Sequence, residues 1–243
     1  MMPGTKHAVF TRHGGVSPAP WDSLNFGSTV GDTQACVQEN LLRALSALEI
    51  ASSSVYDVRQ IHSNLVVEAV SGRNNAPHQP ADAILTRARG VTLLMRFADC
   101  VPILLLDPVT GTIGIAHAGW QGTVKNVVGA AVNRMKAHFG VDPANILAGI
   151  GPSICQDHYQ VGQNVIDAVQ AQFGEDAQAL LDVRESGCYF DLWSANRMLL
   201  EQSGVCSIEV AGICTACSTE DWFSHRASGG TTGRFAALIT FTE

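Results

Sequence analysis

The segment ADCVPILLLDPVTGTIGIAHAGWQG, residues 98–122, holds two apolar runs separated by turn-forming residues. The runs 101–106 and 112–118 are apolar at consecutive positions, as in strands covered on both faces of a sheet. Asp107, Pro108 and Gly111 lie between them, and these residue types favour turns. The segment therefore predicts a buried β-hairpin.

Hairpin geometry places Cys100 and His117 on one face of this hairpin. A two-residue loop at 108–109 sets Cys100 opposite His117, whereas a four-residue loop at 108–111 sets it opposite Gly119. Because side chains alternate with a period of two, both registers leave the thiol and the imidazole on the same face. Such a pair can act as a nucleophile with its base or as two ligands of Zn²⁺ or copper. A buried cysteine beside a capping histidine is the structural alternative.

His62, in VRQIHSN (58–64), adds a second imidazole just ahead of a strand-like run. Taken alone, a histidine in this position more often has a structural role. With Cys100 and His117 it completes a His/Cys/His set, the number of protein ligands in a catalytic zinc site that keeps a fourth position open. We therefore interpret His62, Cys100 and His117 as candidate catalytic and metal-binding residues, with zinc as the expected metal and copper as the alternative.

Composition and charge narrow the class of protein. The 243 residues are 46% hydrophobic and 15% charged, as in well-packed globular proteins, and the formal net charge is −7. A negative chain lacks the basic footprint of a general nucleic-acid or membrane-surface binder. The seven cysteines lack framework spacing, and we find neither a secretory signal nor an apolar run of membrane-spanning length. These features predict a cytoplasmic protein with reduced thiols.

Strand-like and helical segments are mixed along the chain. Three segments, 34–48, 123–139 and 162–173, have apolar residues at helical spacing, and a fourth helix is expected at 191–203. Strands are expected at 7–12, 64–70, 91–97, 101–106, 112–118, 145–151, 208–215 and 235–241. Because strict βαβ alternation is missing, the pattern predicts an α+β protein with mixed sheets and flanking helices, in a single domain over residues 1–243.

Short motifs over nearly the whole chain resemble those of the YfiH-like, laccase-domain family. In order they are TRHGGVS (11–17), SLNFG (23–27), VGD (30–32), QIHS (60–63), ADA (81–83), ADCVPILL (98–105), AHAGWQGT (116–123), GIGPSIC (149–155), VGQNV (161–165), CT (214–215), FSHR (223–226) and TGRFA (232–236). Each motif alone is weak, and together they are specific. Proteins of this family were first labelled multicopper polyphenol oxidases and later purine nucleoside phosphorylases.

The resemblance implies a CNF/YfiH-like single-domain fold. It implies phosphorolysis of adenosine, inosine and 5′-methylthioadenosine, with adenosine deamination as a side activity. The motifs that carry the family's metal ligands are intact, so the metal-binding role falls to His62, Cys100 and His117. The expected partners are purine nucleosides and phosphate, without nucleic acid or membrane, and the oligomeric state stays open.

Arginines are the candidate phosphate ligands. We expect Arg12 to be the first, followed by Arg226 and Arg234, because guanidinium groups match phosphate oxygens in bidentate fashion. The chain departs from the family pattern at two relevant positions. Gln121 replaces the usual basic residue after the tryptophan, and Ala227 replaces the second arginine of the C-terminal FSYRR motif. Both departures bear on the phosphate site and leave the metal trio unchanged.

Two other functions stay open. With Cys100 as nucleophile, the protein would be a Cys–His hydrolase, for instance an amidase that edits peptidoglycan precursors. A copper-dependent polyphenol oxidase is the third reading, although none of the eight histidines has the H-x-H spacing of multicopper sites.

Two further features could bear on the site. CTAC (214–217) has redox or zinc C-x-x-C spacing, but no second cysteine pair at metal-ligand spacing accompanies it, so it receives no role. Asp99 could orient a metal ligand as a hydrogen-bond acceptor, although an aspartate at the start of a strand is more often a cap or turn residue.

Overall fold

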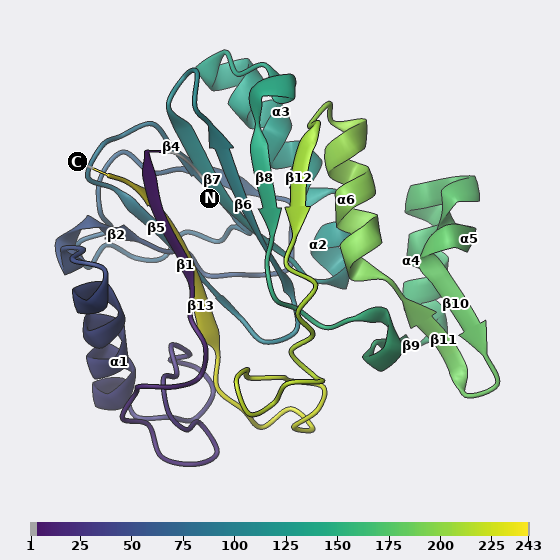
Figure 1. Cartoon of the computed structure of the whole chain (residues 1–243), viewed down its shortest axis with the longest axis horizontal. Coiled ribbons are helices and arrows are strands. Elements are labelled where there is room, and N and C mark those ends of the chain that lie inside the picture. The colour runs from purple at the N-terminus through teal and green to yellow at the C-terminus, as the bar shows by residue number, and fades with distance from the viewer. Residues whose placement is uncertain (1–3, 243) are drawn as a thin grey trace.

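The computed structural model describes residues 4–242, whose strands form three sheets (Figure 1). The six-stranded sheet has, in spatial order, β12 (Ser207–Val210), β8 (Leu147–Ile150), β6 (Val101–Asp107), β7 (Thr112–Ala118), β4 (Ala83–Thr86) and β3 (Val66–Glu68). The four-stranded sheet has β1 (Thr5–Val9), β13 (Phe235–Phe241), β5 (Thr92–Phe97) and β2 (Val55–Tyr56). A small sheet has β10 (Leu181–Arg184), β11 (Gly187–Phe190) and β9 (Gln160–Val161).

Helices cover the outer faces of the two large sheets. Helix α1 (Gln34–Ala47) lies against the four-stranded sheet. The six-stranded sheet is covered by α2 (Trp120–Val124), α3 (Val127–Phe139) and α6 (Leu192–Gln202), while α4 (Gln163–Phe173) and α5 (Ala177–Leu180) flank the small sheet at one side (Figure 1). Short 3₁₀ turns occur at Ser52–Ser54, Pro143–Asn145, Gln156–His158 and Gly174–Asp176. Mixed sheets with flanking helices confirm the predicted fold class.

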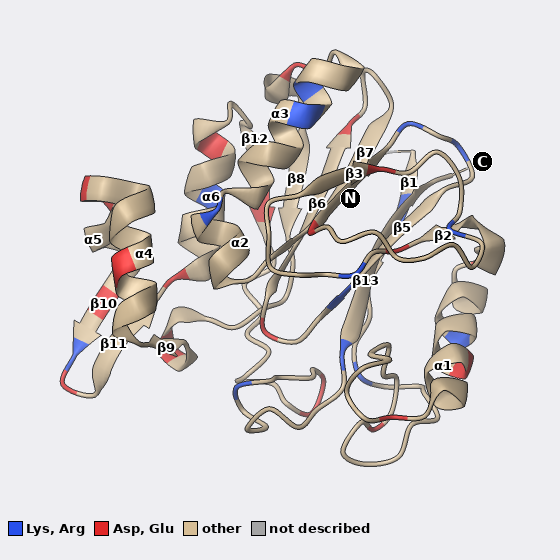
Figure 2. Ribbon diagram, turned by 180° about the vertical axis from the view of Figure 1, so that it is seen from behind, with Lys and Arg blue, Asp and Glu red and all other residues tan. Residues whose placement is uncertain are grey.

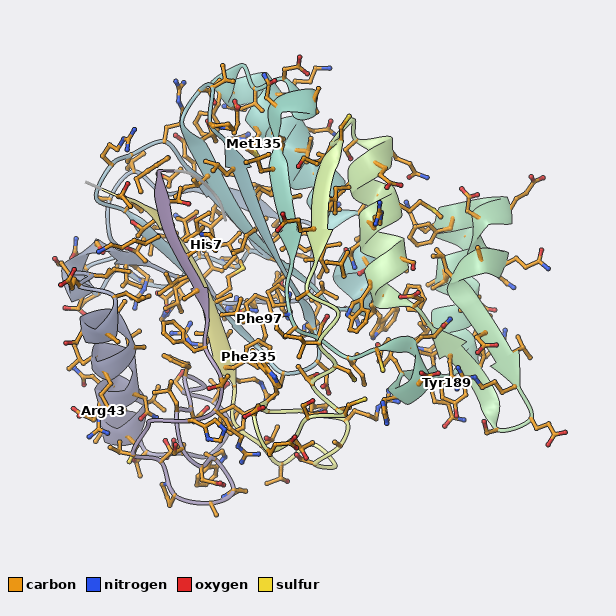
Figure 3. The ribbon with its side chains drawn as sticks, viewed as in Figure 1. His7, Arg43, Phe97, Met135, Tyr189 and Phe235 are labelled. Atoms are coloured by element: carbon orange, nitrogen blue, oxygen red, sulfur yellow. The ribbon has the colours of Figure 1, made fainter. Side chains whose placement is uncertain are left out.

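An apolar core fills the space between the two large sheets. Phe97 of β5 and Phe235 of β13 are cross-strand neighbours with stacked rings, 5.8 Å between centroids (Figure 3). Leu104 and Leu106 of β6 belong to the same buried cluster. Removing this surface from water is the main favourable contribution to packing the two sheets together. The core ends at Phe97, whose ring lies beside His117 at 5.5 Å between centroids, so the sheets' interior adjoins the candidate site.

Of the two predicted registers, the β6–β7 hairpin has the one with a four-residue loop, since Asp107 pairs with Thr112 and Val101 with Ala118. The buried Asp107 carboxylate holds the turn, because it accepts hydrogen bonds from the Val109 and Thr110 backbone N–H groups at 3.0 and 3.2 Å. This register leaves Cys100 and His117 on one face, as predicted.

The helix predicted over 123–139 is instead two helices. It begins three residues earlier, at Trp120, and is interrupted at Asn126, whose φ of 57° lies in the left-handed region. Asparagine tolerates this conformation, and its side-chain oxygen accepts the Gly129 N–H and so caps α3. The spacing of apolar residues cannot predict such a break, because the helical spacing continues across Asn126.

Charged residues lie largely on the outer helices and connecting loops, and few lie inside the strands (Figure 2). No helix in residues 4–242 combines the length and the apolar character needed to cross a membrane.

Candidate active site

A cavity of about 320 Å³ opens where the N-terminal end of β6 meets the loops that follow β7, β8 and β12. Its volume lies at the lower end of the range for small-molecule sites, roughly 300–1,000 Å³. The lining residues are His62, Ala98, Asp99, Cys100, Gly119, Trp120, Gln121, Ile154, Tyr159, Leu192, His225 and Arg226.

The structure brings His62, Cys100 and His117 together at this cavity. One ligand atom from each residue lies within 4.8 Å of the other two, and the two imidazole rings meet edge to face with 5.0 Å between centroids. His117 is buried, Cys100 is half-buried and His62 is exposed. The trio therefore has one side anchored in the core and one side open to a ligand.

Asp82 orients the His117 ring and holds the backbone of His62, and sequence reasoning missed it. Its carboxylate lies 2.9 Å from Nδ1 of the His117 ring, which leaves Nε2 of that ring for Cys100 or a metal. The same carboxylate accepts the backbone N–H groups of Ile61, His62 and Ser63 at 3.2, 3.1 and 2.6 Å. Asp82 is fully buried. The sequence signal was an aspartate in ADA (81–83) directly ahead of a buried strand.

The turn around Asp82 explains the backbone of His62. Three consecutive N–H groups converge on one carboxylate, the anion-binding concavity of a turn, and His62 has a φ of 56° in the left-handed region. Lys125 fixes the turn from outside, because its Nζ donates to the His62 carbonyl at 2.8 Å. This conformation is costly for a non-glycine residue and persists because the surrounding contacts hold it.

Gly119 lies opposite Cys100 when the β6–β7 pairing is continued by one residue beyond Val101 and Ala118. A Cβ at this position would lie 2.7 Å from Sγ of Cys100 and 3.2 Å from Cδ2 of His62. Any side chain here would therefore displace the thiol or the imidazole.

Charges in the trio are mutually stabilising. Burial raises the pKa of the Cys100 thiol, but His117 and hydrogen bonds from both imidazoles outweigh it and lower this pKa to about 6. Burial lowers the pKa of His117, but the Cys100 and Asp82 charges outweigh it and raise it to about 9. Both shifts favour the thiolate form of Cys100 beside the protonated form of His117.

Of the three predicted phosphate-binding arginines, only Arg226 lines the cavity. Its Nη1 donates to the carbonyls of His158 and Gln160 at 3.3 and 2.8 Å, and its guanidinium lies 5.0 Å from the centre of the Tyr159 ring. His225 lies beside it in the lining. Arg226 is therefore held in place by one nitrogen and by stacking.

Arg12 and Arg234 lie outside the cavity lining. Arg12 donates to the carbonyls of Asp22 and Thr219, both at 2.7 Å, and stacks on Phe223. Arg234 donates through Nη1 to the carbonyls of Thr232 and Gly233, and its charge interacts with Cys100. Both guanidinium groups thus brace neighbouring loops.

Asp99 lines the cavity but does not hold a trio imidazole. Its carboxylate accepts the Thr215 hydroxyl at 2.7 Å and the Arg226 backbone N–H at 2.6 Å. Asp99, between β5 and β6, therefore ties down two points of the β12–β13 connection, while Asp82 has the orienting role that the sequence suggested for Asp99.

The chain matches the family described as multi-copper polyphenol oxidoreductase laccase over residues 6–242. It belongs to this family. Within the laccase family, it is 40% identical over 235 residues to a purine nucleoside phosphorylase of Deinococcus radiodurans, covering 96% of this chain and 88% of the relative. It is 36% identical over 242 residues to the purine nucleoside phosphorylase YlmD of Bacillus subtilis, covering 96% and 87%.

Solved structures agree with this membership. The crystal structure of YlmD from Geobacillus stearothermophilus has a TM-score of 0.95 to this chain at 33% identity, covering 100% of this chain and 93% of that one. The YfiH protein of Bacillus licheniformis has a TM-score of 0.93 at 31% identity, covering 98% and 93%. The resemblance to YfiH-like proteins is thereby confirmed.

The donor set of this laccase-family site fits a transition metal. One thiolate and two imidazoles within reach of a single ion suit zinc or copper, and Asp82 supplies the orienting acceptor common behind metal-bound histidines. Three protein ligands would leave one coordination position open toward the cavity.

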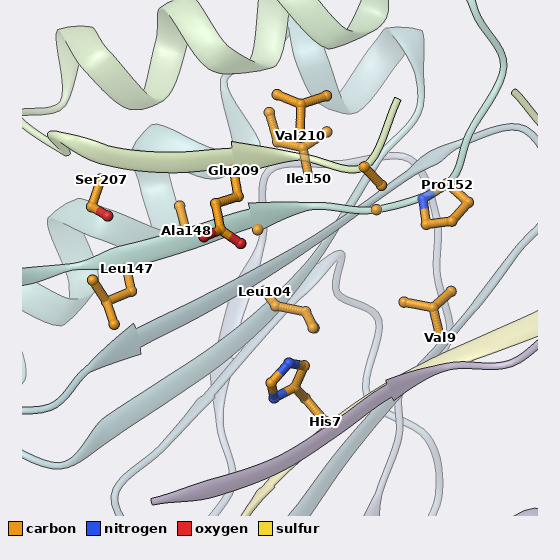
Figure 4. A pocket seen from close by; sticks show the side chains of 13 residues that line it. His7, Val9, Leu104, Leu147, Ala148, Ile150, Pro152, Ser207, Glu209 and Val210 are labelled. Carbon is orange, nitrogen blue, oxygen red and sulfur yellow. The ribbon is translucent and has the colours of Figure 1, made fainter. Parts of the chain in front are cut away.

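A second cavity, of about 270 Å³, lies between β1 and the edge formed by β6, β8 and β12 (Figure 4). Its lining is largely apolar, and His7 and Glu209 are its titratable side chains. Burial lowers the pKa of His7, which favours a neutral ring. The metal-ligating trio and Arg226 thus lie at the first cavity and not at this one.

Proposed function

We propose that the protein is a metal-assisted purine nucleoside phosphorylase. The observation that carries the proposal is the convergence of His62, Cys100 and His117 with Arg226 on one cavity of small-molecule size. It is supported by relatives named purine nucleoside phosphorylase at 34–40% identity over almost the whole chain. Adenosine, inosine and 5′-methylthioadenosine are the proposed substrates.

The metal is assigned to His62, Cys100 and His117. When bound there, zinc or copper with an open position would polarise a phosphate or water oxygen as a Lewis acid. Asp82 keeps the His117 ring in the orientation that leaves Nε2 free, and it keeps the 61–63 turn in place.

Phosphate is assigned to the Arg226 side of the cavity. Arg226 donates through Nη1 to two carbonyls, and within the described residues its Nε and Nη2 have no hydrogen-bond acceptor. These nitrogens can therefore donate to two oxygens of an anion. His225 is exposed beside Arg226 and adds a further donor.

The purine is assigned to the wall formed by Trp120, Ile154, Tyr159 and Leu192. In the reaction, a phosphate oxygen forms a bond to C1′ as the bond from C1′ to the purine nitrogen breaks. The departing base takes that electron pair and needs a proton or a hydrogen bond at N7. Burial raises the pKa of Tyr159, so its hydroxyl keeps its proton and can donate to the base.

The test is product analysis with tag-free protein and each of the three nucleosides, with and without phosphate. We expect free base together with ribose 1-phosphate, or its 5-methylthio analogue, in equal amounts and only when phosphate is present. Base release that is independent of phosphate would make the protein a hydrolase instead. Inosine formed from adenosine in the same assay would reveal the proposed deaminase activity.

A second candidate, a Cys–His hydrolase, is favoured by the chain of contacts from Cys100 to His117 to Asp82. The thiolate, the imidazole and the orienting carboxylate have the roles of a nucleophilic triad. Such an amidase would lose activity on thiol alkylation and keep it in the presence of a chelator. The phosphorylase should instead lose activity on removal of the metal and regain it when zinc is restored.

A further inference from the structure

Four more metal-ligating side chains lie together beside the cavity and outside its lining. Cys155 and His158 belong to the connection between β8 and β9, and Cys214 and Cys217 belong to the connection between β12 and β13. One ligand atom from each lies within 4.8 Å of the other three. We propose that these residues form a second metal centre, a structural zinc site with three cysteines and one histidine.

The distances fit one tetrahedral ion. Nδ1 of His158 lies 3.5 Å from Sγ of Cys155, 3.8 Å from Sγ of Cys214 and 3.4 Å from Sγ of Cys217. With Zn–S bonds of about 2.3 Å and Zn–N bonds of about 2.0 Å, a nitrogen and a sulfur ligand at a tetrahedral angle are separated by about 3.5 Å, and two sulfur ligands by about 3.8 Å. The three nitrogen–sulfur distances therefore match a tetrahedral site, and all four ligand atoms lie within 4.8 Å of one another.

Hydrogen bonding alone does not account for this arrangement. Three thiols surround one imidazole nitrogen, which can make only one good hydrogen bond, and thiols are weak partners. The buried Cys214 sulfur also accepts backbone N–H groups from Cys155, at 3.3 Å, and from Cys217. Such donors favour the thiolate, which is the form that binds metals.

The ligand spacing and the local backbone support the same conclusion. Cys155-x-x-His158 and Cys214-x-x-Cys217 both have two intervening residues, a spacing common in structural zinc sites. The two segments are joined by a parallel bridge between Ser153 and Cys214. The sequence assigned no role to CTAC because no second cysteine pair was found. The missing partner is a cysteine–histidine pair.

The proposed zinc would fix one wall of the active-site cavity. Tyr159 directly follows His158, and Arg226 donates to the His158 carbonyl at 3.3 Å. Both Tyr159 and Arg226 line the cavity, whereas the four ligands do not. Four protein ligands leave no open coordination position, so this centre holds structure and is distinct from the trio.

The test counts metal in full-length, tag-free protein that lacks the trio's thiol. The background variant Cys100→Ala is loaded with zinc, desalted and measured by elemental analysis. We expect about one zinc per chain in this background and a loss of most of it when Cys155→Ser and Cys217→Ser are added. The matched control adds Cys188→Ser and Cys206→Ser, two cysteines outside the cluster, and should keep the zinc.

Cobalt provides a second readout. Co²⁺ in the Cys100→Ala protein should give intense thiolate-to-metal absorption and the visible bands of tetrahedral cobalt, and both should be lost with the Cys155/Cys217 pair. Equal zinc content with and without that pair overturns the proposal, as does a disulfide among Cys155, Cys214 and Cys217 in protein kept under reducing conditions with zinc present. Because Cys100 is absent throughout, neither result depends on whether the phosphorylase activity is found.

Discussion

The carboxylate of Asp82 lies 2.9 Å from Nδ1 of His117, and it also accepts the backbone N–H of His62 at 3.1 Å. One buried side chain therefore holds the ring of His117 and the backbone of His62, two histidines that lie 55 residues apart in the sequence. Burial raises the pKa of Asp82, but hydrogen bonds from His117 and Ser63 outweigh it and lower this pKa to about 2, so the carboxylate stays ionised.

Asp82→Asn should weaken metal binding by about 10–100-fold, because the amide cannot accept both the ring N–H and the turn N–H groups with the strength of a carboxylate. Metal titration with a competing chelator measures this. Asp107→Asn is the matched control, since Asp107 is also buried and holds the far end of the same hairpin. It should lower stability and leave metal affinity unchanged; equal losses of affinity would refute the orienting role of Asp82.

Gly119→Ala should abolish metal binding at the trio, because the new Cβ would lie 2.7 Å from Sγ of Cys100. Gly162→Ala is the control: this glycine also precedes a helix, and its added Cβ would meet only the Asn164 side-chain oxygen, at 3.2 Å. Metal content and circular dichroism should be recorded for both variants. Normal metal content in folded Gly119→Ala protein would contradict the geometry.

Arg226→Ala should raise the KM for phosphate about 10–100-fold, the loss that corresponds to a hydrogen bond with a charged group, with a smaller effect on the KM for nucleoside. Arg12→Ala should mainly lower the unfolding temperature, because Arg12 holds the Asp22 and Thr219 carbonyls. Steady-state kinetics with phosphate varied distinguishes the two. If Arg12→Ala raises the KM for phosphate more than Arg226→Ala does, Arg12 is the main phosphate ligand, as the sequence predicts.

The free energy of unfolding should fall in acid, because protonation of Asp57 removes its ion pairs with Arg73 and Arg96. Burial raises the pKa of Asp57, but Arg96 and Arg73 outweigh it and lower it from 3.8 to about 2. Because the pKa of Asp57 is lower in the folded than in the unfolded protein, the ionised carboxylate stabilises the fold above about pH 4, and this stabilisation is lost as the pH falls toward 2. Its contribution to the free energy of unfolding is about 2 kcal/mol. Urea unfolding of wild type and Asp57→Asn at pH 2–6 measures it. The difference in unfolding free energy between them should shrink below pH 4; a constant difference would contradict the ion-pair account.

Hairpin logic from the sequence was sufficient to place Cys100 and His117 on one face, because strand periodicity and a short turn fix that relationship. His62 could be proposed only through its chemistry, since its position depends on Asp82, 20 residues further along the chain. The signal for Asp82 itself, an aspartate in ADA (81–83) ahead of a buried strand, does not reveal which residues its carboxylate contacts. The Arg12 ranking came from residue type, whereas the side chain's actual partners, Asp22 and Thr219, are set by tertiary packing that sequence periodicity does not describe.

The most direct test of the central claim is phosphate-dependent cleavage of inosine by Cys100→Ala compared with Cys36→Ala, a cysteine of α1 remote from the cavity lining. The account predicts wild-type kcat/KM in Cys36→Ala and a loss of at least about 100-fold in folded Cys100→Ala, with hypoxanthine and ribose 1-phosphate formed in equal amounts by the active proteins. Undiminished phosphorolysis in Cys100→Ala would contradict it.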